Sequence, residues 1–341
     1  MWYAAPVQCG LPIKGITFNF MPSWWYRSFG IAYGERMVFD ADYRVEAWRA
    51  MERSMHDRFG PLSLGSPDPK PRVIPPEWHN AATPAAAGCE VEFPLDNYPV
   101  SHHLPPERIA RLRAPDDIAE TFPYREIIRQ VGELNARLGA DEKPVLPMRG
   151  VANDASLIRG AELFEEIVAE PDVARPLLQW CHRIRLDARQ LSGGASSFAN
   201  CCVMMVSPET YERVFLPYDR VTCLASEQAG HPGSSLHHCG TFDRYARLYR
   251  TLGRLQTVEI GMDSDIKLAL ETFPEAETVS YILNPYLMLR GSPSEVATRV
   301  SGALEAARGH WKRFHLSVPD IEFGSPDSNV SAVLDTVRRA R

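Results

Sequence analysis

Residues 234–260 read SSLHHCGTFDRYARLYRTLGRLQTVEI, and this stretch holds the pattern that decides the fold. The run at 234–238 is short and typical of a β-strand. Apolar residues then recur at helical spacing between 245 and 252, and Gly253 ends that predicted helix. A second β-type run follows at 256–260. Successive strands joined through a helix lie parallel, so the stretch predicts one unit of a parallel α/β fold.

The same alternation continues along much of the chain. Further strands are predicted at residues 144–148, 197–201, 279–283 and 313–317. Ser-Pro pairs mark helix starts, with the serine as cap and the proline in the first helical position, at Ser207, Ser292 and Ser325. This rhythm favours an α/β fold of the closed TIM (β/α)8 barrel type. An open doubly wound sheet is the alternative, but its glycine-rich first turn is missing.

The 341 residues suit one large barrel or two average domains. We predict a single TIM-barrel domain over residues 1–341. Residues 1–70 are expected to form an irregular N-terminal extension, whose first helix at 40–59 packs on the barrel. The proline-rich segment 65–103 is the least regular part of the chain.

Composition excludes several classes of function. The chain has 37 basic and 43 acidic residues, so a broad basic surface for nucleic acid or for an anionic membrane is not expected. No apolar run approaches the about 20 residues of a membrane-spanning helix. The seven cysteines lack a framework spacing, and the N-terminus lacks a secretory signal pattern. We therefore expect a cytoplasmic protein with reduced thiols.

Polar side chains of functional type gather where predicted strands end, which is the functional face of a parallel barrel. Arg149, Asn200 and Asn284 each lie at the end of a predicted strand or just beyond it, and we interpret them as candidate substrate-binding residues. Trp25 and Tyr26 belong to an aromatic stretch that could cover an apolar substrate. Packing of this stretch across the barrel is the simpler interpretation.

His237 and Cys239 form the densest such group. Alternate side chains of a strand point the same way, so the two donors share a face and can both reach Zn²⁺, at ~2.0 and ~2.3 Å. Glu259 ends the next predicted strand and would stand beside them. The alternative is a hydrogen-bonded histidine and a small buried cysteine. Cys201 and Cys202 are interpreted as buried residues rather than a redox pair, because adjacent strand residues point apart.

Several segments resemble the uroporphyrinogen decarboxylase superfamily, in its zinc methyltransferase branch. LHHCGTFDRYARLYRTLG at 236–253 is similar to the H-x-C-G segment of that branch, and VSPETYERVFLPYDR at 206–220 to its serine-proline-glutamate helix. The stretches at 150–178 and 323–338 also agree. Together the similarity covers roughly residues 90–341.

This resemblance implies a TIM barrel with zinc at His237 and Cys239. It places Glu259 like the glutamate ligand of the methionine synthase relative, and makes it the candidate catalytic residue. The implied activity moves a methyl group between a small methylated substrate, of methoxy or methylamine type, and a corrinoid or thiol/folate acceptor. No D-x-H-x-x-G corrinoid signature is present, so a cobalamin would come on a partner protein. A homodimer is compatible with the family.

Two departures refine this expectation. The decarboxylases carry an arginine-rich N-terminal motif, whereas MPSWWYRSFG at 21–30 has one arginine, which disfavours tetrapyrrole decarboxylation. The thiol methyltransferases use a later cysteine as a further ligand, but no cysteine follows Cys239. Asp320, or else Glu322, is the nearest equivalent. A carboxylate there leaves a harder, more Lewis-acidic metal, which favours the demethylase direction. The predicted metal ligands are thus His237, Cys239, Glu259 and Asp320.

Three other functions remain open at this point. A decarboxylase of the same superfamily is one, and alkylation of a thiol, as in epoxide opening, is another. The third is a degenerate barrel that only binds a small molecule or a partner. Absence of zinc, with His237→Ala harmless, would favour this last alternative.

Overall fold

The structure is a computed structural model, which describes residues 4–8, 10–146, 149–193 and 197–340. Its main sheet consists of β1 (Ala4–Val7), β2 (Gly15–Phe20), β5 (Ser197–Ala199), β6 (Ser234–His238), β7 (Leu255–Ile260), β8 (Thr278–Ile282) and β9 (Phe314–Ile321). Within the described residues the strand order is β1-β2-β9-β8-β7-β6-β5. All neighbours from β2 to β5 are parallel, and β1 is antiparallel to β2. The predicted parallel α/β fold is confirmed.

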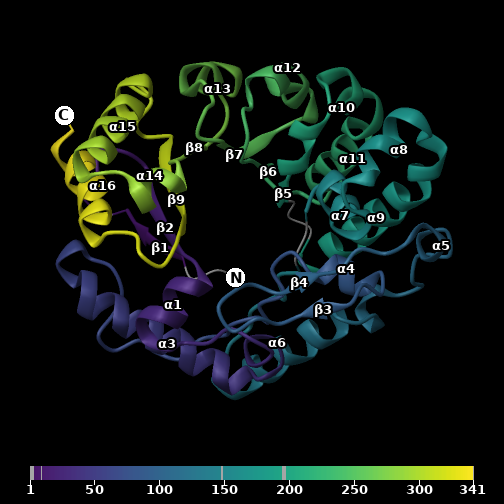
Figure 1. The fold of residues 1–341 in the computed structure, drawn as a ribbon, viewed down its shortest axis with the longest axis horizontal. Helices are drawn as coiled ribbons and strands as arrows, with labels where there is room; N and C mark the ends of the chain where they lie inside the picture. The colour runs from purple at the N-terminus through teal and green to yellow at the C-terminus, as the bar shows by residue number, and fades with distance from the viewer. Residues whose placement is uncertain (1–3, 9, 147–148, 194–196, 341) are drawn as a thin grey trace.

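Helices connect the parallel strands and lie outside the arc that the strands form (Figure 1). The helices in this half are α7 (Val151–Arg159), α8 (Glu162–Ala169), α9 (Pro171–Leu191), α10 (Pro208–Val214), α11 (Leu216–Gln228), α12 (Ala246–Tyr249), α13 (Ile266–Thr272), α14 (Pro285–Arg290), α15 (Pro293–Ala306) and α16 (Asp327–Arg339). Ser207 and Ser292 cap α10 and α15 as predicted, with Ser292 in a full capping box. Ser325 does not cap α16, whose cap position is taken by Pro326.

Short 3-10 turns and a small second sheet complete the regular structure. The turns are η1 (Gly60–Leu62), η2 (Ile118–Glu120), η3 (Cys201–Met205), η4 (Asp243–Tyr245) and η5 (Arg250–Leu252), and the second sheet pairs β3 (Val91–Glu92) with β4 (Val100–Ser101). The turn that matters most for the site is η3, because it follows β5 directly at the carboxyl edge of the main sheet.

The parallel ladder does not close into eight strands within the described residues. The strand expected at 144–148 is not formed up to residue 146, and residues 147–148 lie outside the described part. The chain nevertheless reaches β5, because the Gly150 N–H donates to the Ala199 carbonyl at 2.8 Å. The proline-rich segment 71–79 forms no strand, because its prolines have no N–H to give to a ladder. At its end, His79 and Asn80 line the same cavity as Thr17 of β2 and Arg149.

The first third of the chain contributes α1 (Pro22–Phe29), α2 (Arg36–Phe39), α3 (Ala41–Phe59), α4 (Ala82–Ala86), α5 (Pro106–Ile109) and α6 (Tyr124–Leu138). The helix expected at 40–59 is α3. The expected extension over residues 1–70 does more than pack on the barrel, because β2 within it is an internal strand of the main sheet. One hydrophobic cluster runs from Ala5 to Val337.

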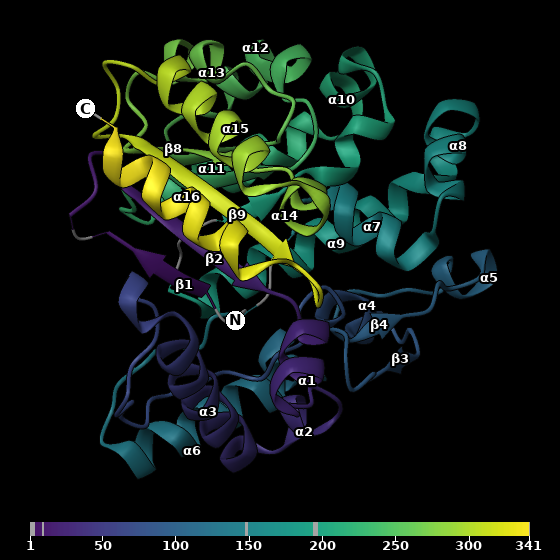
Figure 2. The ribbon, with the colours of Figure 1, turned by 60° about the vertical axis from the view of Figure 1, so that its left-hand side comes forward.

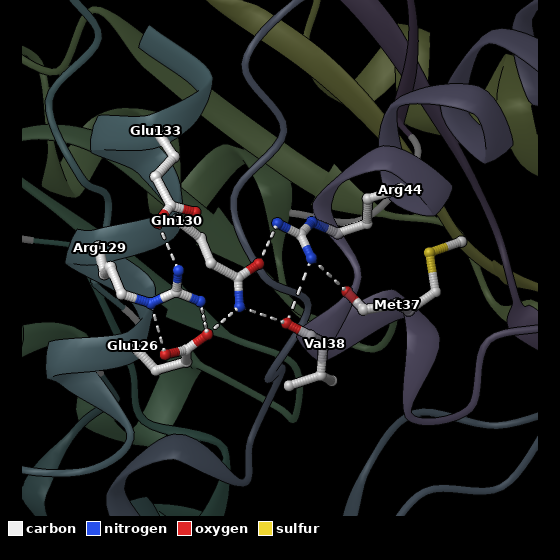
Figure 3. Close-up of polar contacts among 7 residues, drawn as sticks. All are labelled: Met37, Val38, Arg44, Glu126, Arg129, Gln130 and Glu133. Carbon is white, nitrogen blue, oxygen red and sulfur yellow. Dashed lines mark hydrogen bonds and ion pairs between the residues drawn. The ribbon is translucent and has the colours of Figure 1, made fainter. Parts of the chain in front are cut away.

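A buried arginine fastens the proline-rich segment to α3 and α6, which lie side by side away from β7 and β8 (Figures 1 and 2). Arg44 donates to the Ile74 carbonyl at 3.0 Å. It also donates to the Gln130 side chain at 2.7 Å (Figure 3). Gln130 in turn donates to the Val38 carbonyl at 3.1 Å and to the Glu126 carboxylate at 2.6 Å. Side chains thus donate hydrogen bonds to backbone carbonyls that would otherwise need the N–H groups of a neighbouring strand.

None of the helices in the described part of the chain is both long enough and apolar enough to cross a membrane.

Candidate metal centre

Three potential metal ligands meet where β5 and β6 end. Cys201 opens the η3 turn after β5, His237 is near the end of β6, and Cys239 follows β6. One ligand atom from each lies within 4.8 Å of the other two. The Asn200 N–H donates to the His237 carbonyl at 2.8 Å, so the residue before Cys201 is tied to the middle of the cluster. Parallel strands bring these residues together because their carboxyl ends share one edge of the sheet.

The cluster fits a Zn²⁺ ion in its donor chemistry and its size. Two thiolate sulfurs at ~2.3 Å from zinc in a tetrahedral site lie about 3.8 Å apart. The observed upper limit of 4.8 Å therefore needs only a small closure of the three groups. Three protein ligands with one open position are the arrangement of catalytic rather than structural zinc sites.

Of the three groups, only Cys201 is biased toward the protonation state of a metal ligand. Hydrogen bonds from Cys239 and His237 hold the pKa of the Cys201 thiol far below its usual range. The contact with Cys201, together with burial, raises the pKa of Cys239. Burial would lower the pKa of His237, but hydrogen bonds to Cys201 and Glu259 raise it instead. The metal-free centre therefore holds a Cys201 thiolate beside a protonated imidazole, and a divalent cation would replace the protons.

Glu259 contacts the cluster through His237. Its Oε2 accepts a hydrogen bond from Nδ1 of His237, and its Oε1 accepts one from Ser280 at 3.3 Å. Burial would raise the pKa of Glu259, but its interactions with His237 lower it overall. With Nδ1 engaged, Nε2 is the nitrogen left for a metal. Glu259 thus has the place of a carboxylate that orients a histidine ligand, and its direct ligation and catalytic role stay predictions.

Two residues of the cluster, Cys201 and His237, line a cavity of about 620 Å³. Its lining includes Thr17, Asn19, His79, Asn80, Arg149, Asn153, Leu157, Ala199, Cys201, Cys202, His237, Glu259, Ile282, His315, Ser317 and Pro319. The His237 side chain keeps 34% of its surface accessible, so the metal centre is reachable from this space. A cavity of this size takes a small molecule.

Arg149 is the substrate-binding candidate that the structure places in this cavity. Its Nε is buried and has no hydrogen-bond partner among the described residues. Burial lowers the pKa of its guanidinium, while the nearby Asp154 acts in the opposite direction. Asn153, one turn away, accepts the N–H of Cys202 at 3.0 Å and so holds the turn that carries Cys201.

Asp320 and Glu322 do not belong to the three-residue cluster. Asp320 follows the cavity residue Pro319 and has a φ of 54°, in the left-handed region. Burial, with the neighbouring charge of Glu322, raises the pKa of its carboxyl. Glu322 accepts a hydrogen bond from the Ser23 hydroxyl. The third member of the cluster is Cys201, which was not among the predicted ligands. Ligation by Asp320, whose carboxyl interacts electrostatically with His237 and Cys201, stays a prediction.

The other four substrate-binding candidates lie outside the cavity lining. Asn200 is buried and donates to Asp219 at 2.7 Å, and Asn284 caps α14 by accepting the Tyr286 N–H at 2.9 Å. Trp25 is fully buried and donates to the Phe20 carbonyl at 3.1 Å. Tyr26, on the outer side of α1, is 38% exposed. Trp25 of the aromatic stretch is therefore a packing residue, in agreement with the simpler interpretation of the sequence.

Cys201 is the site residue that sequence reasoning missed. The sequence predicts a strand at 197–201, in which Cys201 and Cys202 would point apart. In the structure β5 ends at Ala199 and the chain turns into η3, so strand alternation does not apply there. Its position at a strand exit was the available signal. His315 and Thr17 also line the cavity, but neither lies at the end of a predicted strand.

The chain is thus a parallel α/β protein in which the ends of β5 and β6 bring two cysteines and a histidine, a donor set that could hold a metal ion, beside a cavity. The sequence model of the uroporphyrinogen decarboxylase family matches residues 80–340, and the chain belongs to this family. A methyltransferase from Methanosarcina mazei has a similar TIM-barrel fold, with a TM-score of 0.65 and 14% identity, over 98% of this chain and 93% of that chain. Among curated proteins no significant match was found.

Proposed function

We propose that this protein is a zinc-dependent methyltransferase that acts on a small methylated compound of methoxy or methylamine type. The observation that carries the proposal is the Cys201, His237 and Cys239 cluster facing a cavity of about 620 Å³. The family and the fold shared with a methyltransferase support it. The proposed acceptor is a corrinoid carried by a partner protein, or else a thiol or folate.

The second cysteine of the cluster weakens the argument for the demethylase direction of methyl transfer. That argument depends on a carboxylate ligand, which would leave a more Lewis-acidic metal. Cys201 supplies a second thiolate instead, which donates more electron density and is at least as well suited to holding a thiol acceptor. We therefore propose the methyl transfer without assigning its direction, and the assay includes both directions.

Each residue of the proposed site would have its own role in binding the metal or the substrate. Cys201, Cys239 and His237 hold the metal, which when bound lowers the pKa of a thiol or polarises the oxygen of a methyl ether. Glu259 keeps His237 in the tautomer that presents Nε2. Arg149, with its free buried Nε, orients an acceptor atom or an anionic group of the substrate. Leu157 and Ile282 are apolar parts of the lining that limit water near the reacting methyl group.

The test combines metal analysis with methyl transfer. Protein purified without chelators should hold about one zinc per chain. It is then incubated with Co(I) cobalamin and a panel of methoxylated and methylamine compounds, while the cobalt absorption spectrum is followed. The reverse assay supplies methylcobalamin with a thiol or a folate. Transfer that is lost in Cys239→Ser and kept in Cys223→Ser, a buried cysteine that is not part of the cluster, is the expected result.

Zinc binding without transfer from or to any of these compounds would refute the methyltransferase and leave thiol alkylation, as in epoxide opening, to be assayed. A chain that holds no zinc, and in which His237→Ala is harmless, would be a binding barrel.

A further inference from the structure

Behind the metal centre, one row of polar side chains crosses the barrel interior. His237 on β6 is in register with Glu259 on β7, Glu259 with Ser280 on β8, and Ser280 with His315 on β9. Residues in register on parallel strands point to the same face of the sheet, so the four side chains enter the interior at one level. Thr17 on β2 continues the row, with its Oγ1 3.0 Å from Nε2 of His315.

The hydrogen bonds of this row have one consistent direction. The ionised Glu259 only accepts, so the Ser280 hydroxyl donates to its Oε1 at 3.3 Å. That hydroxyl has a single hydrogen, so the 3.0 Å contact between Ser280 and Nδ1 of His315 requires His315 to be the donor. Burial lowers the pKa of His315, which favours the neutral ring. Nε2 is then an acceptor, and it receives the hydroxyl hydrogen of Thr17.

The row separates two cavities. The upper cavity contains the metal centre, and a lower one of about 300 Å³ has walls rich in serine and threonine hydroxyls. His237, Glu259 and His315 line both. A carboxylate between two such spaces could turn toward either. Ser280 and His237 each hold one of its oxygens, and His315 determines where the Ser280 hydrogen points.

We propose that His315 is a positioning residue for the metal centre. With its proton on Nδ1, it directs the Ser280 hydroxyl to Glu259. When a metal ion displaces the Nε2 proton of His237, Glu259 keeps the remaining proton on Nδ1, so that the Nε2 lone pair faces the metal between Cys201 and Cys239. This role rests on the metal centre of the proposed function, but it does not depend on which group is transferred.

The tautomer is the direct test. Proton–nitrogen correlation spectra of the metal-free protein, labelled with ¹⁵N-histidine, distinguish a ring protonated on Nδ1 from one protonated on Nε2. The His315 signals are assigned by their loss in His315→Asn. We expect His315 to be neutral with its proton on Nδ1, and the same spectra of Ser280→Ala should show that preference lost. A proton on Nε2 in the wild-type protein would overturn the proposal.

Metal affinity tests the consequence, with Zn²⁺ itself as the probe in competition with a chelating dye and Co²⁺ as a spectroscopic substitute. His315→Leu and Ser280→Ala should each weaken Zn²⁺ binding on the order of tenfold, the lower range for residues that support a ligand. They should also alter the Co²⁺ spectrum. His315→Asn, whose amide can donate from the place of Nδ1, should restore most of the affinity.

Thr257→Val is the matched control, because Thr257 lines the same lower cavity but has no side-chain hydrogen bond among the described residues. It should bind Zn²⁺ like the wild type. Wild-type affinity in both His315→Leu and Ser280→Ala would refute the positioning role. A wild-type chain unable to bind Zn²⁺ would refute the metal centre and this role together, whereas intact binding without methyl transfer would refute only the proposed reaction.

Discussion

The Sγ atoms of Cys201 and Cys239 lie within 4.8 Å of each other, although the two cysteines follow different strands of the sheet. The contact depends on where β5 ends. Because the strand stops at Ala199, the chain can turn and direct Cys201 across to the end of β6. A candidate metal site of two cysteines and one histidine is thereby formed without any cysteine from the C-terminal part of the chain.

Replacement of Cys201 should therefore abolish stable metal binding. Cys201→Ser removes one of three protein ligands, and we expect at least a hundredfold loss in Zn²⁺ affinity, by analogy with the 10–100-fold that loss of a supporting residue alone produces. Competition with a chelating dye measures it. Cys202→Ser is the control, since Cys202 points to Ser156, with 3.2 Å between Sγ and Oγ. Equal affinities of the two variants would contradict the assignment of Cys201.

Asp320→Asn separates the sequence-based ligand set from the clustered one. Asp320 lies outside the three-residue cluster, so the variant should keep about one zinc per chain and nearly wild-type affinity. If Asp320 were the third ligand, this variant would lose zinc and Cys201→Ser would keep it. Zinc content after gel filtration distinguishes the two outcomes.

The sequence was sufficient for the parts of the fold that depend on local periodicity. Strand–helix alternation after residue 196 indicated parallel strands, and Ser207 and Ser292 marked real helix starts. It was not sufficient for the part of the chain between β2 and Gly150. There the chain is held by long-range contacts such as that of Arg44 with the Ile74 carbonyl, which leave no periodic pattern.

The candidate site, like the fold, could be predicted from the sequence only where local strand patterns place its residues. His237 and Cys239 could be paired from strand alternation, and the register of β6 with β7 brought Glu259 beside His237. Cys201 could not be added, because its direction depends on the residue at which β5 ends. Element ends are set by tertiary contacts, here the bond from the Asn200 N–H to the His237 carbonyl, more than by local propensity.

The lowered pKa of Cys201 predicts an unusual pH dependence of alkylation in the metal-free protein. A depressed pKa keeps the thiolate populated as the pH falls. The rate of Cys201 modification by iodoacetamide should therefore change little between about pH 8 and pH 6, whereas that of an ordinary thiol falls about tenfold per unit. Peptide mass spectrometry follows each site. Cys202, whose pKa is raised by burial, is the internal comparison, and parallel pH profiles for both would count against a Cys201 thiolate.

A buried ion pair behind β5 should couple folding stability to the metal site. Arg185 donates to Asp219 at 2.9 Å, with side chains only 1% and 2% exposed. Asp219 also accepts from Asn200 at 2.7 Å and from Tyr211 at 2.9 Å. Asp219→Ala leaves a buried, uncompensated guanidinium and should lower the free energy of unfolding by about 3–5 kcal/mol. It also releases Asn200, so the Zn²⁺ affinity of the folded fraction should fall.

Urea-induced unfolding and dye competition measure these two effects. Asp187→Ala is the matched control, because Asp187 pairs with Arg183 on the same helix, α9, and the Asp187 and Arg183 side chains are 19% and 56% exposed. A pair that solvent reaches in this way contributes about 1 kcal/mol or less. The double variant Arg185→Leu/Asp219→Leu should recover much of the stability, since no buried charge remains, but it should not restore the metal affinity, because Asn200 stays without its acceptor. Recovery of both together would mean that Asn200 does not position Cys201.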